Sequence, residues 1–548
     1  MAKIKNIILT GTILMGGMLG TSCNDWLDLG PIDYYGSENY WKTEENVIAY
    51  VDGLHKALRD VTFNHTIVFG ELRGGHYIGD ATCDGSSVYN PQIINQMFDL
   101  DRTGVSNFGD IYGKITNCNL LLARIDNVSM NEARKEYYKG IAYGLRAFYY
   151  FELHRLYGGV PLRLDVAVID GELDPVKLYM GRHKPSEVLA QIKSDIKSSL
   201  DAFGNQTGWN PYGHGAKSYW NKAATECLAA DVYLWSGKVS VGDHKANSAD
   251  LDVAKNHLNN VINNYGLALL GDFAKVFDAR NKANSEIVFA VRYAEGEATN
   301  NNINWCYSTT TGQTWQQSKR EDGSDWGDPF GISSGGGYNY MGYEYKKPVF
   351  ESFDREDTRR DATFIGSYRD TDGDGVLELY GTHVLKNIGY INSSNQRIFC
   401  GDYIFYRLAW AYLSLAEIAN YQDNKADVEK YMNLIRERAY GENWDKDTHG
   451  YVAGDFTQNE LAILQEKTKE FIQEGQRWWD LLRMTYTKGG DALVFHKEAS
   501  IDGEKPILDK ATEAHKVLWP INKGVMDNDS TIFQTPGYGA GSQKECQW

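Results

Sequence analysis

The segment Arg146-Ala-Phe-Tyr-Tyr-Phe-Glu-Leu153 combines small residues with large aromatic ones inside a long stretch of helical periodicity. Two later segments share this combination, Cys227-Leu-Ala-Ala-Asp-Val-Tyr-Leu234 and Arg407-Leu-Ala-Trp-Ala-Tyr-Leu413. Small residues allow paired helices to approach closely, and aromatic rings fill the space between one pair and the next. The pattern indicates stacked helix–turn–helix repeats, although ordinary helical core packing would also produce it.

Apolar residues recur every three or four positions around these segments, which predicts a series of helices. The predicted helices span residues 44–60, 110–125, 131–156, 186–200, 218–236, 251–265, 403–420, 426–439 and 459–474. They fall into successive pairs. We therefore expect a mainly α fold of tetratricopeptide-like helix-pair repeats, which cover about residues 44–265 and 402–440.

One long insertion, residues 267–404, interrupts the helices. It contains short apolar runs such as Ile287-Val-Phe-Ala-Val291, followed by a polar stretch rich in Gly and aromatic residues at about 294–345. A second irregular region covers residues 64–108. Loops of this length are usually functional or disordered, and disordered segments are poor in aromatic residues. We therefore expect these two regions, 64–108 and 294–345, to carry the function.

The charge of the chain limits its partners. Its 548 residues include 56 Lys and Arg against 73 Asp and Glu, a net charge of −17. Nucleic-acid binding depends on Lys and Arg that neutralise phosphates, so this balance disfavours a nucleic-acid partner. The chain also holds 36 Tyr and 14 Trp, more aromatic residues than a core is expected to need.

The N-terminus is typical of an exported protein. Lys3 and Lys5 precede an apolar run at 7–19 that is too short and too rich in Gly to span a membrane. Small residues then lead directly to Cys23, as in a bacterial lipobox. We expect residues 1–22 to be a signal peptide and Cys23 to carry a lipid anchor; a plain signal-peptidase site is the alternative.

The other cysteines are widely and irregularly spaced, and no CxxC motif occurs. This spacing does not suggest a disulfide framework or a zinc site. We expect mostly buried free thiols at Cys83, Cys118, Cys227, Cys306, Cys400 and Cys546.

Several distinctive motifs occur in series along the chain. The sharpest is Glu474-Gly-Gln-Arg-Trp-Trp-Asp-Leu-Leu-Arg483. Others are Cys23-Asn-Asp-Trp-Leu-Asp-Leu-Gly-Pro31, the helical segments 146–162, 406–417 and 432–439, and the ending Leu518-Trp-Pro-Ile-Asn522 with Gln534-Thr-Pro-Gly-Tyr538. Together they resemble the SusD/RagB family of nutrient-binding outer-membrane lipoproteins from Bacteroides-type bacteria. Asn522 departs from the family, where a second proline is common. Helical spacing predicts that most of these motif residues, such as Trp478 and Trp479, belong to the core.

The resemblance implies one domain, residues 23–548, built on about four tetratricopeptide-like units, with C-terminal family motifs at about 459–538. It implies a location on the outer membrane, facing the cell exterior. It also implies a partner, a SusC-like TonB-dependent transporter, to which captured ligand is passed. Binding without catalysis follows from the same resemblance, with no cofactor required.

Tyr and Trp rings suit sugar ligands, because a pyranose presents an apolar C–H face while its hydroxyls seek polar side chains. In relatives, the sugar site draws on the two irregular regions. By approximate position, the resemblance suggests Tyr89, Asp84 and Arg73 from the first region and Trp305 and Tyr338 from the second. We add Trp315 from the second region. For each ring, loop packing or a transporter contact is the alternative.

The segment Asp370-Thr-Asp-Gly-Asp-Gly375 places oxygen ligands at alternate positions, as in the first half of an EF-hand loop. The twelfth position, where an EF-hand has a bidentate Glu, is Gly381. Asp370, Asp372, Asp374 and Glu378 are therefore candidates for a non-standard structural Ca²⁺ site. A solvated hairpin turn is the alternative.

Two other functions remain open. The same architecture could bind peptides, as in the RagB branch, through backbone hydrogen bonds. A helical glycoside hydrolase would need two carboxylates about 5–10 Å apart across the scissile bond, and acidic residues are too abundant for the sequence to exclude such a pair.

Overall fold

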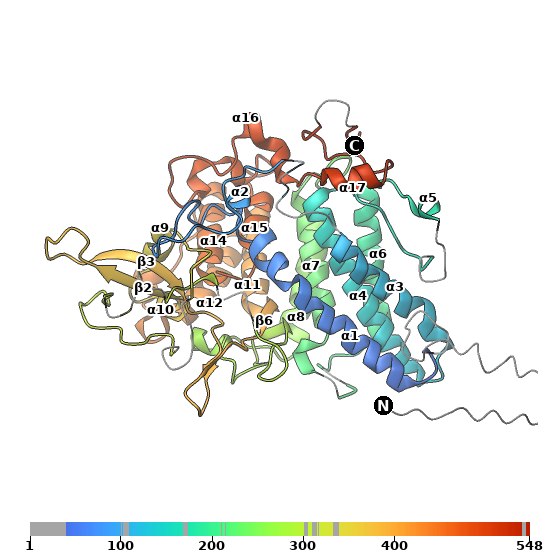
Figure 1. Cartoon of the computed structure of the whole chain (residues 1–548), viewed down its shortest axis with the longest axis horizontal. Coiled ribbons are helices and arrows are strands. Elements are labelled where there is room, and N and C mark those ends of the chain that lie inside the picture. Colours follow the sequence, from blue (N-terminus) through green and yellow to red (C-terminus); the bar gives the residue numbers. More distant parts are fainter. Residues whose placement is uncertain are drawn as a thin grey trace, which may run out of the picture.

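A computed structural model describes residues 40–99, 101, 103, 109–167, 174–209, 211–213, 215–300, 305–309, 315, 317–331, 339–539 and 544–548. Helices dominate it; those of residues 44–265 occupy one side of the molecule in Figure 1, and the hairpin of residues 364–384, part of the insertion, projects from the other. The longer helices are α1 (Glu44–Phe63), α3 (Gly109–Arg124), α4 (Glu132–Tyr157), α6 (Pro185–Phe203), α7 (Lys222–Lys238), α8 (Asp250–Asn264), α11 (Leu408–Tyr421), α12 (Lys425–Tyr440), α14 (Phe456–Glu470) and α15 (Arg477–Arg483). The predicted mainly α, tetratricopeptide-like fold is confirmed.

Shorter helices and strands lie between these. The short helices are α2 (Pro91–Ile94), α5 (Pro175–Leu178), α9 (Lys347–Glu351), α10 (Thr358–Thr363), α13 (Lys446–His449), α16 (Lys510–Glu513) and α17 (Lys523–Asn528). The strands are β1 (Ile287–Val291), β2 (Phe364–Arg369), β3 (Glu378–Val384), β4 (Tyr390–Ile391), β5 (Arg397–Ile398) and β6 (Tyr403–Arg407).

The helices pack in sequence order, α3 on α4, α4 on α6, α7 on α8 and α11 on α12. Small residues make the close contacts that the repeated pattern predicts. A methyl group on Gly144 of α4 would lie 2.1 Å from Nε1 of Trp220, so no larger residue fits there without displacing that ring. Capping residues mark where two of these helices begin. The Asn131 and Asn221 side chains accept backbone hydrogen bonds from the first turns of α4 and α7.

Two predicted boundaries are wrong. Residues 403–407 are strand β6 and not the start of a helix, because they pair antiparallel with β1, which lies within the insertion. Periodicity within the segment cannot show a partner more than a hundred residues away. Likewise, residues 64–69, predicted as the start of an irregular region, continue α1 as a π-helical turn.

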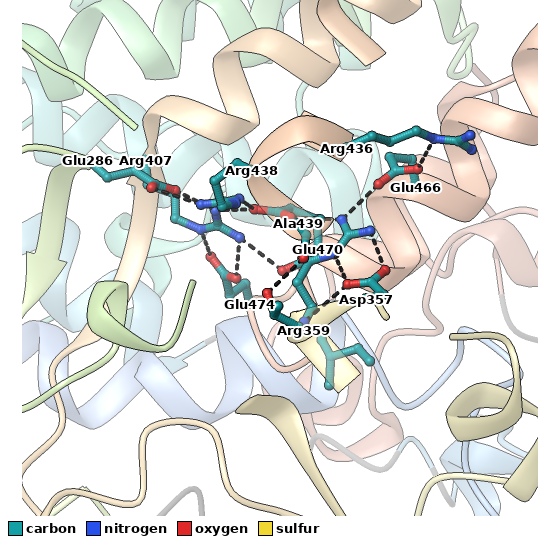
Figure 2. Close-up of polar contacts among 12 residues, drawn as sticks. Glu286, Asp357, Arg359, Arg407, Arg436, Arg438, Ala439, Glu466, Glu470 and Glu474 are labelled. Atoms are coloured by element: carbon teal, nitrogen blue, oxygen red, sulfur yellow. Dashed lines mark hydrogen bonds and ion pairs between the residues drawn. The ribbon is translucent and has the colours of Figure 1, made fainter. Parts of the chain in front are cut away.

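A buried network of charges holds the insertion on the helices (Figure 2). Arg407, at the end of β6, contacts Glu286 at 2.8 Å, Glu470 at 2.6 Å and Glu474 at 2.7 Å. Arg438 of α12 also pairs with Glu286 and Glu470. Burial acts to raise the pKa of Glu470, but the arginines around it lower the pKa well below its usual value. Arg359 extends the network to Asp357 and Glu466, so α10, α12, α14 and the β1–β6 pair share one ion cluster.

The C-terminal motif is core, as predicted. Trp478 and Trp479 are fully buried, as are Tyr149, Tyr150 and Trp235. The backbones of Gly70 and Gly475 cross so closely that a methyl group on Gly70 would lie 2.2 Å from the Gly475 carbonyl oxygen. This crossing joins the end of the π-helical turn to the motif.

The six cysteines of the described chain carry free thiols, and five of them are buried. In the part of the chain that the structure describes, no helix is both long enough and apolar enough to cross a membrane.

Candidate binding site

The two irregular regions meet on one surface. Residues 305–309 run antiparallel to 339–343, with hydrogen bonds from the Gly342 N–H to the Trp305 carbonyl (2.9 Å) and from the Thr309 N–H to the Asn339 carbonyl (3.0 Å). The first region lies along this pair, because the Tyr89 N–H donates to the Gly342 carbonyl at 2.9 Å. Contacts between residues more than two hundred positions apart thus assemble the site.

Three rings define what we call the aromatic surface: Tyr89, Trp305 and Tyr340. The Tyr89 ring is 43% exposed and its centroid lies 6.0 Å from that of Trp305, edge to face. Trp305 is half-buried and rests on Phe63 of α1, with centroids 4.9 Å apart. Tyr340 is 60% exposed. It lies two residues before Gly342, so the Cα atoms of the two residues are within about 7 Å of each other.

Gly342 fixes the position of Tyr89. A methyl group at residue 342 would lie 2.3 Å from Cδ2 of the Tyr89 ring, so the ring can lie against the backbone only because this residue is Gly. Buried Tyr343 supports the same ring from the side, with centroids 5.8 Å apart. The Tyr89 ring is therefore held in place before any ligand arrives.

Asp84 connects the two regions. Its carboxylate accepts hydrogen bonds from the Ser308 hydroxyl (2.5 Å), the Met341 N–H (3.0 Å) and the Ser86 N–H (2.9 Å). Partial burial acts to raise the pKa of Asp84, but these hydrogen bonds outweigh it and lower the pKa below its usual value. Asp84, which is half-buried, therefore positions the loop that bears Tyr89.

Glu344 makes a second connection of this kind. Its carboxyl oxygens accept the Cys83 N–H at 2.6 Å and the Thr382 N–H at 3.2 Å. Burial raises the pKa of Glu344 to about 7, against the effect of these two hydrogen bonds. The loop of residues 80–89 is thereby attached to β3 as well.

Two of the predicted contacts lie inside the protein. Arg73 has no exposed surface; its guanidinium carbon lies 3.9 Å from the Trp478 ring centroid and 4.6 Å from that of Phe98. Trp315 is 7% exposed and packs against Trp326, Phe330 and His383. We therefore leave both out of the aromatic surface. Tyr338 lies outside the described residues, as does Cys23.

The Asp-rich segment forms the turn of the β2–β3 hairpin. Asp370, Asp372 and Asp374 are exposed and have carboxylate oxygens within 4.8 Å of one another. Glu378 lies outside this group, on β3 opposite Arg369. The three carboxylates also accept backbone hydrogen bonds within the turn, such as that from the Gly373 N–H to Asp370 at 2.7 Å. Three of the four predicted ligands are thus brought together, and Ca²⁺ at this turn stays a prediction.

Tyr340 was not singled out by the sequence. It lies among nine aromatic residues between 305 and 345, and nothing local distinguishes it from buried neighbours such as Tyr343 and Tyr345. The backbone contact between Gly342 and Tyr89 was equally invisible, because it depends on pairing between distant segments.

The molecule is thus a helical-repeat scaffold that presents a preformed aromatic surface on two loop regions, which is the architecture of a binding protein. The SusD family model matches residues 303–538, and a second model, described as "Starch-binding associating with outer membrane", matches residues 47–234. A crystal structure of a SusD superfamily protein from Bacteroides fragilis is 55% identical, with a TM-score of 0.86, covering 91% of this chain and 100% of that one. The chain belongs to the SusD family.

Two further relatives extend the comparison. B. fragilis NanU is 31% identical with a TM-score of 0.77, and the match covers 93% of this chain and 100% of that one. SusD-like protein P38 of Formosa agariphila is 24% identical over 519 residues, 88% of this chain and 92% of that one. The similarity therefore spans nearly the whole length of each protein.

Proposed function

We propose that this chain is a cell-surface lipoprotein that binds oligosaccharides and polysaccharides on the aromatic surface and delivers them, chemically unchanged, to a SusC-like TonB-dependent outer-membrane transporter. The observation that carries the proposal is the exposed ring of Tyr89, held against Gly342 and beside Trp305. The family model described as starch-binding and outer-membrane associating supports it.

The exposed rings of the aromatic surface and the polar groups beside them suit a sugar ligand. A pyranose lays its apolar C–H face on an aromatic ring, and its hydroxyls need polar partners at the edge of that ring. Asp80 is exposed, and its carbonyl accepts a hydrogen bond from the Val88 N–H at 3.0 Å. This bond places Asp80 beside the end of the loop that carries Tyr89. Exposed Tyr and Trp have only two side-chain torsions, so little conformational entropy is lost when they bind.

The experiment is a glycan array followed by calorimetry of the strongest ligand. We expect Tyr89→Ala and Tyr340→Ala each to weaken binding by about tenfold, which is about 1.4 kcal/mol. Tyr179→Ala is the matched control, since this ring is also exposed but lies beside α5. All three melting temperatures should stay close to that of the wild type. The glycan affinities of Trp305→Ala and Tyr338→Ala are measured in the same way.

Three results would redirect the proposal. Unchanged affinity in the Tyr89→Ala/Tyr340→Ala double variant would mean that the glycan binds elsewhere. An array without hits, together with binding to a peptide mixture, would support the peptide-binding function. New reducing ends released from a bound polysaccharide would identify a hydrolase.

The anchor and the transporter need separate tests. Cys23→Ala should abolish labelling by a fatty-acid analogue and release the protein from the outer-membrane fraction. Wild-type protein extracted in mild detergent should co-purify with a TonB-dependent transporter. Recovery of the lipidated protein without any transporter would contradict the delivery step.

A further inference from the structure

A cavity that shares no lining residue with the aromatic surface lies where the entry to α7 meets β1. Its volume is ≈ 490 Å³, within the range of about 300–1,000 Å³ typical of small-molecule sites. Small side chains, including Ala216, Ala283 and Ala290, form much of its wall. Its charged lining residues are Lys217, Lys282, Arg292, Glu295 and Asp402. We call this cavity the Lys217 pocket.

Lys217 is a buried cation without a carboxylate partner. The residue as a whole is only 6% exposed. The ammonium donates to the Asn284 carbonyl at 2.7 Å and lies 4.2 Å from the Trp209 ring centroid. Among the described residues, no carboxylate oxygen lies within 4.0 Å of the Lys217 ammonium, the distance that defines an ion pair. Burial lowers the pKa of Lys217 to about 8. Buried charges in proteins are normally paired.

The other two cations of the pocket have partners. Lys282 contacts Asp402 at 2.7 Å and the Cys400 carbonyl at 2.8 Å. Arg292 pairs with Glu297 at 3.4 Å. Glu295, the remaining carboxylate of the lining, accepts a hydrogen bond from the Tyr390 hydroxyl at 2.6 Å. Among the described residues, Lys217 is therefore the one cation of the lining that no carboxylate neutralises. An incoming dianion would meet Glu295 and Asp402, so a single negative charge matches the pocket best.

We propose that the Lys217 pocket binds a small molecule through a carboxylate group, which accepts a hydrogen bond from the Lys217 ammonium. A carboxylate would supply the missing partner of the buried cation, and such charge-assisted bonds are about twice as strong as neutral ones. The proposal does not depend on glycan binding at the aromatic surface, since the two sites have no lining residue in common.

The test uses sodium acetate, lactate, glucuronate and galacturonate, with glucose and galactose as the neutral counterparts of the two sugar acids. Binding is measured by calorimetry and by thermal shift at constant ionic strength. At least one acid should bind the wild type about tenfold more tightly than its neutral counterpart. Lys217→Met should lose at least about tenfold in affinity for that acid.

The matched control is Lys222→Met, which removes the same charge at the first residue of α7, where the ammonium donates to the Gly204 carbonyl on the surface. It should bind the acid as the wild type does. Lys217→Met should fold with an unchanged or higher melting temperature, because a buried unpaired cation is removed.

Each remaining outcome overturns the proposal. These outcomes are no binding by any of the four acids, equal binding to Lys217→Met, equal binding of the neutral sugar, and a Lys217-dependent stabilisation by chloride as large as that by the acid.

Discussion

Replacing Glu71 by Gln should change how stability depends on pH. Glu71 follows the π-helical turn and is 2% exposed, at the crossing between Gly70 and Gly475. Its carboxyl group accepts the Gly475 N–H at 3.0 Å and lies 3.5 Å from the Tyr345 hydroxyl. Burial raises the pKa of Glu71 from 4.5 to about 8, against the smaller opposing effects of the Gly475 N–H and of the Lys386 and Arg477 charges. The folded protein therefore holds this group protonated at neutral pH.

The sign and size follow from proton linkage. Since the pKa is higher in the folded state than in the unfolded chain, the folded state binds the extra proton. The resulting stability is fully present below about pH 4.5 and is lost as the pH rises through about 8. At roughly 1.4 kcal/mol per pKa unit, the loss is on the order of 3–5 kcal/mol. Gln cannot ionise, and its amide can accept from Gly475 and donate to Tyr345, so the Glu71→Gln variant lacks this loss.

Urea unfolding of both proteins between pH 5 and pH 8.5 measures the difference. The variant should gain stability relative to the wild type as the pH rises, by about 1 kcal/mol for each unit between pH 5 and pH 8. Glu351→Gln, at an exposed position in α9, is the control and should give a constant difference. If the Glu71→Gln difference is equally constant, Glu71 is ionised in the folded protein and burial does not raise its pKa.

Three more predictions concern the network, the aromatic surface and the hairpin turn. Arg407→Met removes the cation that three buried carboxylates share and should cost about 3–5 kcal/mol in urea unfolding; a loss below about 1 kcal/mol would show that the network is not needed to hold the insertion. Gly342→Ala places a methyl group 2.3 Å from the Tyr89 ring, so glycan affinity should fall as far as in Tyr89→Ala while the melting temperature hardly moves, and unchanged affinity would remove Tyr89 from the site. Millimolar Ca²⁺ should raise the melting temperature of the wild type but not of Asp372→Ala, and equal shifts would exclude Ca²⁺ from the turn.

Helices and core were predictable because their signals are local. An apolar stripe every three or four residues located nine helices to within a few residues, apart from the first residues of the predicted helix at 403–420. The same spacing correctly assigned Trp478 and Trp479 to the core. The prediction missed strand β6 because its pairing partner, β1, lies more than a hundred residues earlier in the chain.

The candidate site was predicted at the level of regions, and only in part at the level of residues. The two irregular regions do meet, and Tyr89 and Trp305 lie within 6.0 Å of each other. Arg73 and Trp315 have the residue types of a sugar site, yet both are enclosed by other side chains. Composition shows that rings are present and cannot show which of them face the solvent.

Periodicity and motifs are read along the chain, so the amino-acid sequence alone was enough to predict the helical repeats and the family. It also marked the two irregular regions that meet at the candidate site. Which rings are exposed became clear from the folded chain, since Trp315 is covered by Trp326 and Phe330, whereas Tyr89 lies against Gly342 and keeps 43% of its surface exposed. The folded chain also showed that Lys217 is a buried cation without a carboxylate partner among the described residues. Exposure and pairing depend on segments that are distant in sequence, and these meet only when the chain folds.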